Sequence, residues 1–325
     1  MTTANRYASL AFVVLGATVL AGCASHSGVE GSFDRQFTVN GPVALELSTG
    51  SGDAHITVGP PGEVRIHGDI QVDSWSSESG RTRLQQVQSN PPISQEGNLI
   101  RVGGSRQGRN DVSVDYTIVV PPDTQLRSAA GSGDLKVAGI QGPANFTCGS
   151  GDVTASEISG DVQIVCGSGD VKLSNIKGQA HVSTGSGDIT LDTIRGETRL
   201  QTGSGTLEIS NPGEALEAST GSGDITIKGA SADVRLRTSS GDIDVEGNPG
   251  SSNYWDFHSS SGEATLHVPP TASFRLYARS SSGDIDAAIP IVMEGTTGKH
   301  ELRARIGDGK ARVEIQTSSG NISLH

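Results

Sequence analysis

A row of aspartates at 18-residue intervals is the feature of this chain with the clearest chemical potential. Each follows a short Ser/Gly triplet that ends in glycine, and the row comprises Asp134, Asp152, Asp170, Asp188, Asp224 and Asp242, with Thr206 at its one break. Carboxylate oxygens are preferred ligands of Ca²⁺, so stacked copies could hold a row of cations. The same carboxylates could instead accept hydrogen bonds from backbone amides of their own tight corners, as Asp commonly does in turns.

Two features of the repeat favour the hydrogen-bonding role. Calcium-binding nonapeptide repeats have a residue between their second Gly and the Asp, and they bind the ion between turns. Here Asp follows Gly directly, and the opposite corner of the repeat carries no series of carboxylates. We therefore expect no metal and no cofactor, with the cation row kept as the alternative.

The outward positions of the repeat do not suggest catalysis. They mix Thr, Ser, Lys, Gln, Glu and Arg without a convergent acid–base group, although β-helix enzymes that act on polysaccharides make the question relevant. Glycoside hydrolysis needs a pair of carboxylates at a defined separation. The histidines lack metal-ligand spacing, and neither a nucleophile elbow nor a phosphate-binding loop is present. We expect no catalytic residues and no enzyme.

An aromatic cluster near residue 255 is the other candidate binding feature. Trp255 and Phe257 fall in inward columns of the repeat, where large side chains would fill a widened core. Their polar neighbours would then face outward and form a modest ligand patch, consisting of Tyr254, Asp256, His258 and, one coil later, Tyr277.

A stacked repeat must position all of these residues. After each motif glycine, the second and fourth residues are apolar and the third is polar, a period-two alternation typical of a half-buried strand. A second alternating segment follows about nine residues later. Two strands and two corners per 18 residues predict an all-β, single-domain β-solenoid (β-helix-like) whose short strands stack in parallel, with irregular capping segments at both ends.

The glycines mark the corners of the expected coil. One corner is the Gly-Ser-Gly triplet, and the other carries Gly142, Gly160, Gly178 and Gly196. Glycine adopts positive φ at little steric cost. We therefore expect positive φ at these corners and take it as the reason for glycine there. Residues 131–250 are the regular coils of a domain expected over 33–325, and residues 74–96 are predicted to be an excursion or cap with a short helix.

Cys148 and Cys166 occupy the same inward column, one coil apart. Cα atoms in adjacent coils lie about 5 Å apart, which is within the range of a disulfide. The alternative is a pair of buried thiols in a column that later coils fill with threonine. The spacing leaves both open.

The N-terminus has the pattern of a secretory signal over residues 1–22, with Arg6 before an apolar run. It ends in Leu20-Ala21-Gly22-Cys23, which resembles a bacterial lipobox and implies lipid attachment at Cys23. We expect residues 23–32 to be a short linker. Ala24, in place of the Asp that often retains lipoproteins at the inner membrane, implies an outer-membrane location in the cell envelope.

The charge of the chain limits its partners. The formal net charge is −12, and no basic cluster is visible along the sequence. Nucleic acid and anionic headgroups are therefore not expected as partners. Membrane contact would come through the N-terminal lipid alone. An envelope protein or a glycan is the expected ligand class.

The repeated Ser-Gly-Asp-apolar-x-apolar unit, Val120-Pro121-Pro122 at a strand end and the closing segment from Thr317 to Ile322 together resemble a bacterial family of adhesin-like β-strand-repeat domains. The similarity spans roughly residues 33–325. It implies a non-catalytic adhesion or scaffolding module on a lipid anchor. The alternatives are a periplasmic partner of an envelope-stress or signalling system and a glycan-active β-helix enzyme.

Overall fold

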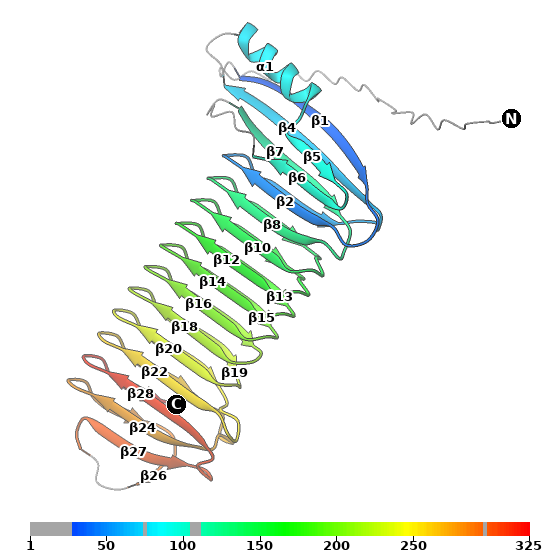
Figure 1. Ribbon diagram of the computed structural model, residues 1–325. Helices are drawn as coiled ribbons and strands as arrows, with labels where there is room; N and C mark the ends of the chain where they lie inside the picture. Colours follow the sequence, from blue (N-terminus) through cyan, green and yellow to red (C-terminus); the bar gives the residue numbers. More distant parts are fainter. Residues whose placement is uncertain (1–27, 74–76, 105–111, 295–297) are drawn as a thin grey trace, which may run out of the picture.

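The computed structural model describes residues 28–73, 77–104, 112–294 and 298–325, which build one long stack of coils (Figure 1). Two sheets run the length of the stack, one on each side of a shared core. Sheet 1 has 14 strands and sheet 2 has 15, and successive coils contribute one strand to each. The all-β solenoid expected from the 18-residue period is confirmed.

In sheet order, sheet 1 consists of β1 (Gly28–Thr38), β4 (Glu63–Asp73), β7 (Val112–Val120), β3 (Ala54–Val58), β9 (Leu135–Ala138), β11 (Val153–Ser156), β13 (Val171–Ile176), β15 (Ile189–Ile194), β17 (Leu207–Pro212), β19 (Ile225–Ala230), β21 (Ile243–Gly247), β23 (Ala264–His267), β29 (Ile322–Leu324) and β25 (Ile285–Ala287). Sheet 2 consists of β26 (Val292–Met293), β27 (Glu301–Ile306), β24 (Phe274–Ser280), β28 (Ala311–Thr317), β22 (Tyr254–Ser259), β20 (Val234–Thr238), β18 (Leu216–Thr220), β16 (Thr198–Thr202), β14 (Ala180–Thr184), β12 (Val162–Cys166), β10 (Ala144–Cys148), β8 (Gln125–Ala130), β2 (Ala44–Thr49), β6 (Leu99–Gly103) and β5 (Ile93–Glu96).

The strands of the regular coils pair in parallel at a constant shift of 18 residues. Val153 faces Val171 and Val171 faces Ile189 in sheet 1, while Ala144 faces Val162 in sheet 2. Inward residues of both sheets are buried, and Ile140, Ile158, Ile176 and Ile194 fill the core at the second corner. Since every inward position lies over its equivalent in the next coil, the core is a set of continuous apolar columns.

The corner glycines are explained by stacking, and the expected positive φ is wrong for them. None of the glycines at the two corners named in the sequence analysis lies in the left-handed region. A Cβ on Gly151 or Gly187 would instead overlap the carbonyl oxygen of the equivalent glycine one coil earlier. The left-handed column lies elsewhere, at the C-terminal ends of the sheet 1 strands, and consists of Gly139, Glu157, Asn175, Thr193, Asn211 and Gly229.

Both ends of the stack contain an inserted coil. Near the N-terminus, β2 and β3 lie between the first regular coil and the later strands β6 and β7. Near the C-terminus, β28 and β29 pair between β22–β23 and β24–β25, so the last coil in the chain is not the last coil of the stack. The motif glycines follow the same order, since Gly320 stacks on Gly262 and Gly283 stacks on Gly320.

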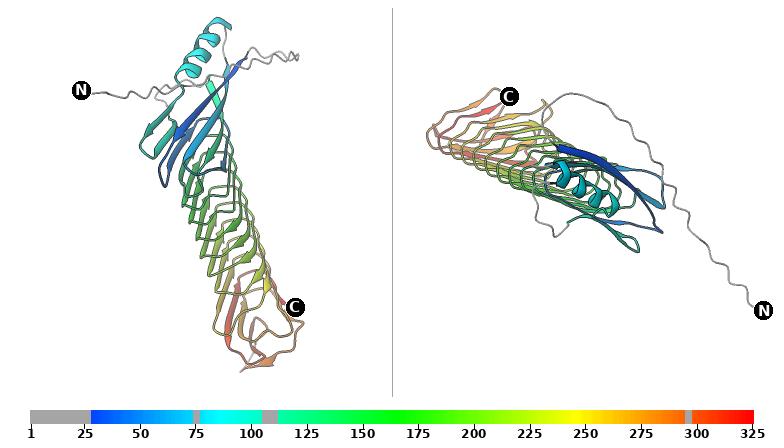
Figure 2. Two further views of the ribbon diagram at one scale, coloured as in Figure 1. Left: turned by 90° about the vertical axis from the view of Figure 1, so that its right-hand side faces the viewer. Right: turned by 90° about the horizontal axis from the view of Figure 1, so that it is seen from above.

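The N-terminal end is covered by α1 (Ser77–Ser89), which packs on β1 and β4 (Figures 1 and 2). The short helix expected within residues 74–96 is therefore present, and β5 also lies in that range. Leu84 points from α1 into the core. A Cβ on Gly31 would come 2.8 Å from Leu84 Cδ1, so the absence of a side chain at Gly31 lets the helix approach β1.

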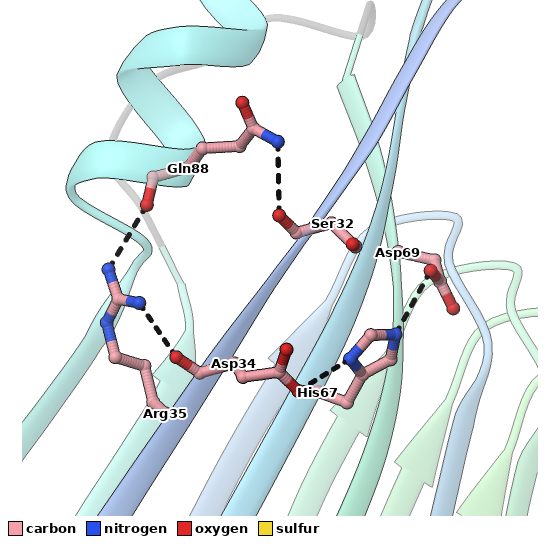
Figure 3. A network of polar contacts seen from close by, with 6 residues as sticks. All are labelled: Ser32, Asp34, Arg35, His67, Asp69 and Gln88. Atoms are coloured by element: carbon pink, nitrogen blue, oxygen red, sulfur yellow. Dashed lines mark hydrogen bonds and ion pairs between the residues drawn. The ribbon is translucent and has the colours of Figure 1, made fainter. Parts of the chain in front are cut away.

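A polar network links α1 to the outer surface of β1 and β4 (Figure 3). Gln88 Nε2 donates to the Ser32 carbonyl, and Arg35 donates to the carbonyls of Asp34 and Gln88. Beside them, His67 Nδ1 lies 2.8 Å from Asp34 Oδ1 and its Nε2 lies 3.2 Å from Asp69 Oδ1. The hydrogen bond to Asp34 raises the pKa of His67 above its ordinary 6.5, and Asp69 adds to the rise while partial burial opposes it.

This histidine predicts a pH dependence at the N-terminal end. A folded pKa above the unfolded one stabilises the fold fully below pH 6.5, and that stabilisation is lost as pH rises through the folded pKa. We expect hydrogen-exchange protection of β1 and β4 amides to fall over that window. His67→Gln should remove this pH-dependent fall in protection, while the protection of amides in the regular coils should stay unchanged. A fall of equal size in the variant would contradict the assignment.

The start of the domain is earlier than the sequence indicates. β1 begins at Gly28, so residues 28–32, expected to be linker, belong to a strand that pairs antiparallel with β4. The signal segment, Cys23 and the rest of the linker up to residue 27 lie outside the described residues. Within the parts of the chain that are described, no helix has the length and apolar character needed to cross a membrane.

Candidate functional site

The aspartate row forms a hydrogen-bonded ladder between coils. In each regular step, Asp Oδ1 accepts the backbone N–H of the residue one coil later: Asp134 from Asp152 at 3.0 Å, Asp152 from Asp170 at 2.9 Å and Asp170 from Asp188 at 2.9 Å. Asp224 does the same for Asp242. The ladder also extends beyond the aspartate row, because Asp53 accepts from the N–H of Asp134. The acceptor role is thus present, but it joins neighbouring coils instead of closing a single corner.

An asparagine in the same column shows what the ladder requires. Asn321 Oδ1 accepts the backbone N–H of Asp284 at 3.0 Å, in the geometry of the aspartates. A neutral acceptor therefore satisfies the position. Among the residues that the structure describes, no three His, Cys, Asp or Glu side chains gather into a metal-binding group. The arrangement supports the ladder as a structural device.

Substitutions at Asp170 test this role. Asp170→Asn keeps an oxygen acceptor and should leave the free energy of unfolding nearly unchanged, whereas Asp170→Ala should cost about 1 kcal/mol because the Asp188 amide loses its partner. Thermal unfolding of both variants in EDTA and in millimolar calcium gives the measurement. A large calcium-dependent rise in wild-type stability that Asp170→Asn abolishes would support the cation row instead.

A second ladder runs inside the same corner and contains the cysteines. Thr202 Oγ1 donates to the Gly187 carbonyl at 3.0 Å and accepts the Gly205 N–H at 3.1 Å, and Thr220 repeats this one coil later. Cys148 and Cys166 fill the equivalent positions and form a disulfide with Cα atoms 4.5 Å apart. Of the two arrangements that the sequence left open, the structure has the bridge, which joins two coils where the hydrogen bonds of threonine do so elsewhere.

The aromatic pair near residue 255 lies in the core as expected. Trp255 and Phe257 are fully buried, with ring centroids 5.9 Å apart. Tyr254 is only half-buried on the outer side, where its hydroxyl donates to Glu314 Oε2 at 2.9 Å and Arg312 lies over its ring. Burial, followed by the bond to Glu314, raises the pKa of Tyr254 to about 12. This hydroxyl is a neutral donor at physiological pH.

Asp256 differs from the expectation, since it is on the outer side yet only 6% exposed. It lies beneath the side chains of two arginines, with Oδ2 3.9 Å from Arg235 and 3.8 Å from Arg237. His258 Nε2 is 2.8 Å from Oδ1, but the angles do not make a hydrogen bond, and Oδ1 is buried without one. Asp256 is therefore not open to a ligand. It acts as the anion around which three basic side chains collect.

Tyr277 is also placed differently, because β28 lies between its strand and β22. Along the outer row, Asp256 faces Glu314 and Glu314 faces Tyr277. Tyr277 is half-buried, with Arg303 over its ring at 5.1 Å. The four expected patch residues therefore lie on one face of sheet 2, although the inserted strand separates Tyr277 from the other three.

The stacking gathers basic residues that are scattered in the sequence. On the outer side of sheet 2, eight arginines lie between β16 and β27: Arg199, Arg235, Arg237, Arg275, Arg279, Arg303, Arg305 and Arg312. Arg101 and Arg127 lie on the same side nearer the N-terminal end. Several pair with neighbouring carboxylates, as Arg199 does with Glu217 at 3.0 Å and Arg305 with Glu294 at 3.2 Å. The expectation of no basic cluster was wrong for the folded chain. We call this surface the arginine face.

A shallow groove of about 490 Å³ lies at the edge of the arginine face, where the strands of sheet 2 enter the Ser-Ser-Gly corners. Its charged or amide-bearing lining residues are Arg237, His258, Gln316 and Arg279, from four neighbouring strands. Serine and threonine hydroxyls supply most of the remainder. Such a lining can donate many hydrogen bonds and attract negative charge.

The sequence of these coils matches a known protein family. The model of the family Toastrack DUF4097 matches residues 67–247 and 179–325, which together cover most of the chain. This chain belongs to the Toastrack DUF4097 family. Both matched regions include regular coils, so the 18-residue unit with its Ser-Gly-Asp corner is common to both. No curated protein is detectably similar in sequence.

Three solved structures resemble this Toastrack chain at low sequence identity. They are a candidate cell adhesion protein from Clostridium sporogenes (13% identity, 90% of this chain and 99% of that one, TM-score 0.26), a candidate adhesin from Bacteroides fragilis (14%, 91% and 97%, 0.40) and a candidate lipid binding protein from Parabacteroides distasonis (13%, 90% and 96%, 0.38). At these values the likeness carries no argument about ligands or sites.

Proposed function

We propose that this Toastrack chain is a lipid-anchored module of the cell envelope that works in adhesion or scaffolding and has no catalytic activity. The observation that carries the proposal is the arginine face, a broad polar surface assembled on a rigid stack by residues distant in sequence. A surface of this kind suits an extended partner. Its ion pairs and exposed side chains are spread along several coils and do not converge on one point.

The placement of the two ends supports this role. β1 begins beside α1 at one end of the stack, and the arginine face lies toward the other end (Figure 1). Fourteen strand spacings of about 4.8 Å separate the outermost strands of sheet 2 by about 65 Å. A lipid on Cys23 would therefore hold the α1 end at the membrane and project the arginine face away from it.

The hydrogen bonds and ion pairs of the acidic residues support a non-catalytic function. A glycosidase needs a carboxylate pair flanking a reacting bond. Here the corner aspartates accept backbone N–H groups, and Asp256 is buried beneath arginines. Glu314 accepts from Tyr254 and pairs with Arg312. These carboxylates are already committed to holding the fold together.

The proposal is tested in a bacterial host with an outer membrane. The full chain should label with radioactive palmitate and sediment with outer membranes, and Cys23→Ser should abolish both. Cells carrying the wild-type chain should bind other cells or an immobilised envelope fraction more strongly than cells carrying Cys23→Ser. Labelling that persists in Cys23→Ser would contradict the anchor.

Other outcomes separate the alternatives. Specific co-purification of one membrane protein, with no cell binding, would favour an envelope-stress or signalling partner. Turnover of a polysaccharide that is lost on replacing one outward carboxylate would favour an enzyme. Either result would overturn the adhesion proposal.

A further inference from the structure

Four neighbouring coils at the C-terminal end present the same pair of outward side chains. Each has a hydrogen-bonding side chain on sheet 2 and a serine two residues later, at the corner. In the order of β20, β22, β28 and β24, the pairs are Arg237 with Ser239, His258 with Ser260, Gln316 with Ser318 and Arg279 with Ser281. The registers place these four donors in one row across the strands.

The five preceding coils show that the fold does not require this pair. Their equivalents are Thr147 with Gly149, Val165 with Gly167, Ser183 with Gly185, Gln201 with Gly203 and Ser219 with Gly221. The corner column therefore changes from glycine to serine at β20, and the strand column gains Arg237, His258 and Arg279 where the preceding coils have only Thr, Val, Ser or Gln. In the preceding coils a Cβ at this corner, as at Gly203 or Gly221, would overlap the carbonyl oxygen one coil earlier, so the serines mark a corner of different geometry. A surface that gains both hydroxyls and positive charge at one end of the rod points to a ligand.

Part of the row has no partner within the protein, whereas Arg237 and His258 lie 3.8 Å and 2.8 Å from the carboxylate oxygens of the buried Asp256. Among the described residues, Arg279 makes no ion pair, and the hydroxyls of the four corner serines make no hydrogen bond. Glu301 is the neighbour of Arg279 on the adjacent strand β27, but it pairs with Arg303 at 2.8 Å instead. The buried hydroxyls behind them are occupied, since Thr238 and Thr317 each bridge two corners. The groove therefore offers cations and free hydroxyls side by side.

The geometry points to an acidic glycan as the ligand, an extended polysaccharide bearing carboxylate or sulfate groups and lying across the strands along the rod. The inference rests on the proposed adhesive function, for which it names the ligand class. Arg237 and Arg279 are three strand spacings apart, about 14 Å. Arginine forms paired hydrogen bonds with carboxylate or sulfate-like anions, and serine hydroxyls suit the sugar hydroxyls between them.

The same observations disfavour nucleic acid. Duplex DNA carries one charge per about 1.7 Å, and the chain as a whole has a net charge of −12 that would repel so dense a polyanion. Binding of single strands relies on aromatic platforms for the bases. The groove has no Phe, Tyr or Trp among its lining residues, and Tyr254 and Tyr277 lie outside it under arginines. A sparsely charged, hydroxyl-rich polymer fits better.

Calorimetric titration of the chain from residue 24 tests the inference, since this form keeps α1 and every strand. The probes are oligogalacturonate for carboxylate, chondroitin sulfate oligosaccharide for sulfate, and neutral dextran. We expect at least one acidic probe to bind, more weakly at higher salt, and dextran not to bind. Arg237→Gln combined with Arg279→Gln should weaken binding at least about tenfold. The matched control is Lys136→Gln with Lys172→Gln, which removes equal charge from sheet 1 and should leave affinity unchanged.

A second variant guards against misfolding. Ser239→Gly with Ser281→Gly restores the corner residue of the preceding coils, so it should keep the melting temperature while weakening binding about threefold. Unchanged affinity in the arginine variant, equal binding of dextran, or no binding of either acidic probe would overturn the inference. Tighter binding of single-stranded DNA than of both glycans would assign the groove to nucleic acid. Because the titration needs neither lipid nor cells, glycan binding without cell adhesion would refute the proposed function alone.

Discussion

Gly187→Ala should lower the free energy of unfolding by about 3 kcal/mol or more, because the added methyl group has no space in the stack. An ideal Cβ at Gly187 would overlap the carbonyl oxygen of Gly169 and lie 3.1 Å from the backbone nitrogen of Asp170. Backbone atoms cannot rotate aside as a side chain can. The coils must separate, and the Asp170–Asp188 ladder bond lengthens with them.

Gly50→Ala is the matched control, since Gly50 belongs to a Gly-Ser-Gly triplet but has no heavy atom within 4 Å of an added Cβ. Its effect should be neutral or slightly stabilising, because alanine restricts the unfolded chain. Urea unfolding of both variants provides the comparison. Equal, small effects would show that stacking contact does not select the motif glycines.

These glycines also show where sequence reasoning is limited. Their period and their position at corners were evident, and the coil of two strands followed from it. The reason why glycine is needed there was not evident, because local sequence does not reveal how closely one corner approaches the next. The left-handed column carries Glu157, Asn175 and Thr193 as well as glycine, so composition alone could not identify it.

The inserted coils were hidden for a topological reason. The motifs ending at Gly262, Gly283 and Gly320 are visible in the sequence, but the stack orders them 262, 320, 283. Pairing of β28 between β22 and β24 depends on contacts between segments far apart in the chain. The placement of Tyr277 was therefore mistaken, while the inward columns within each strand were correct.

The arginine face was missed for the same reason. Its residues are spread from Arg199 to Arg312, and no short window of sequence is strongly basic. Aligning the coils by their motif glycine would have shown a detectable signal, the change from glycine to serine at residues 239, 260, 281 and 318. Where a solenoid is built from near-identical units, a corner column that changes together with the charge of the adjacent strand column points to a binding surface.

Leu173→Asp should lower the free energy of unfolding by about 4 kcal/mol or more, because it places an unpaired carboxylate in a closed apolar column. Leu173 is 2% exposed and stacks between Ala155 and Leu191 in neighbouring coils. No cation lies in that column to pair with the new charge. The effect should therefore spread to both adjacent coils, and hydrogen exchange should report loss of protection in β11, β13 and β15 together.

Lys172→Asp provides the control, because the neighbouring side chain points outward and is exposed. It introduces the same residue into the same strand, so any effect of strand propensity is shared. Its expected cost is below about 1 kcal/mol. A loss at Lys172 equal to that at Leu173 would mean that the strand tolerates aspartate poorly on either side, and the alternation that defines the coil would no longer explain its stability.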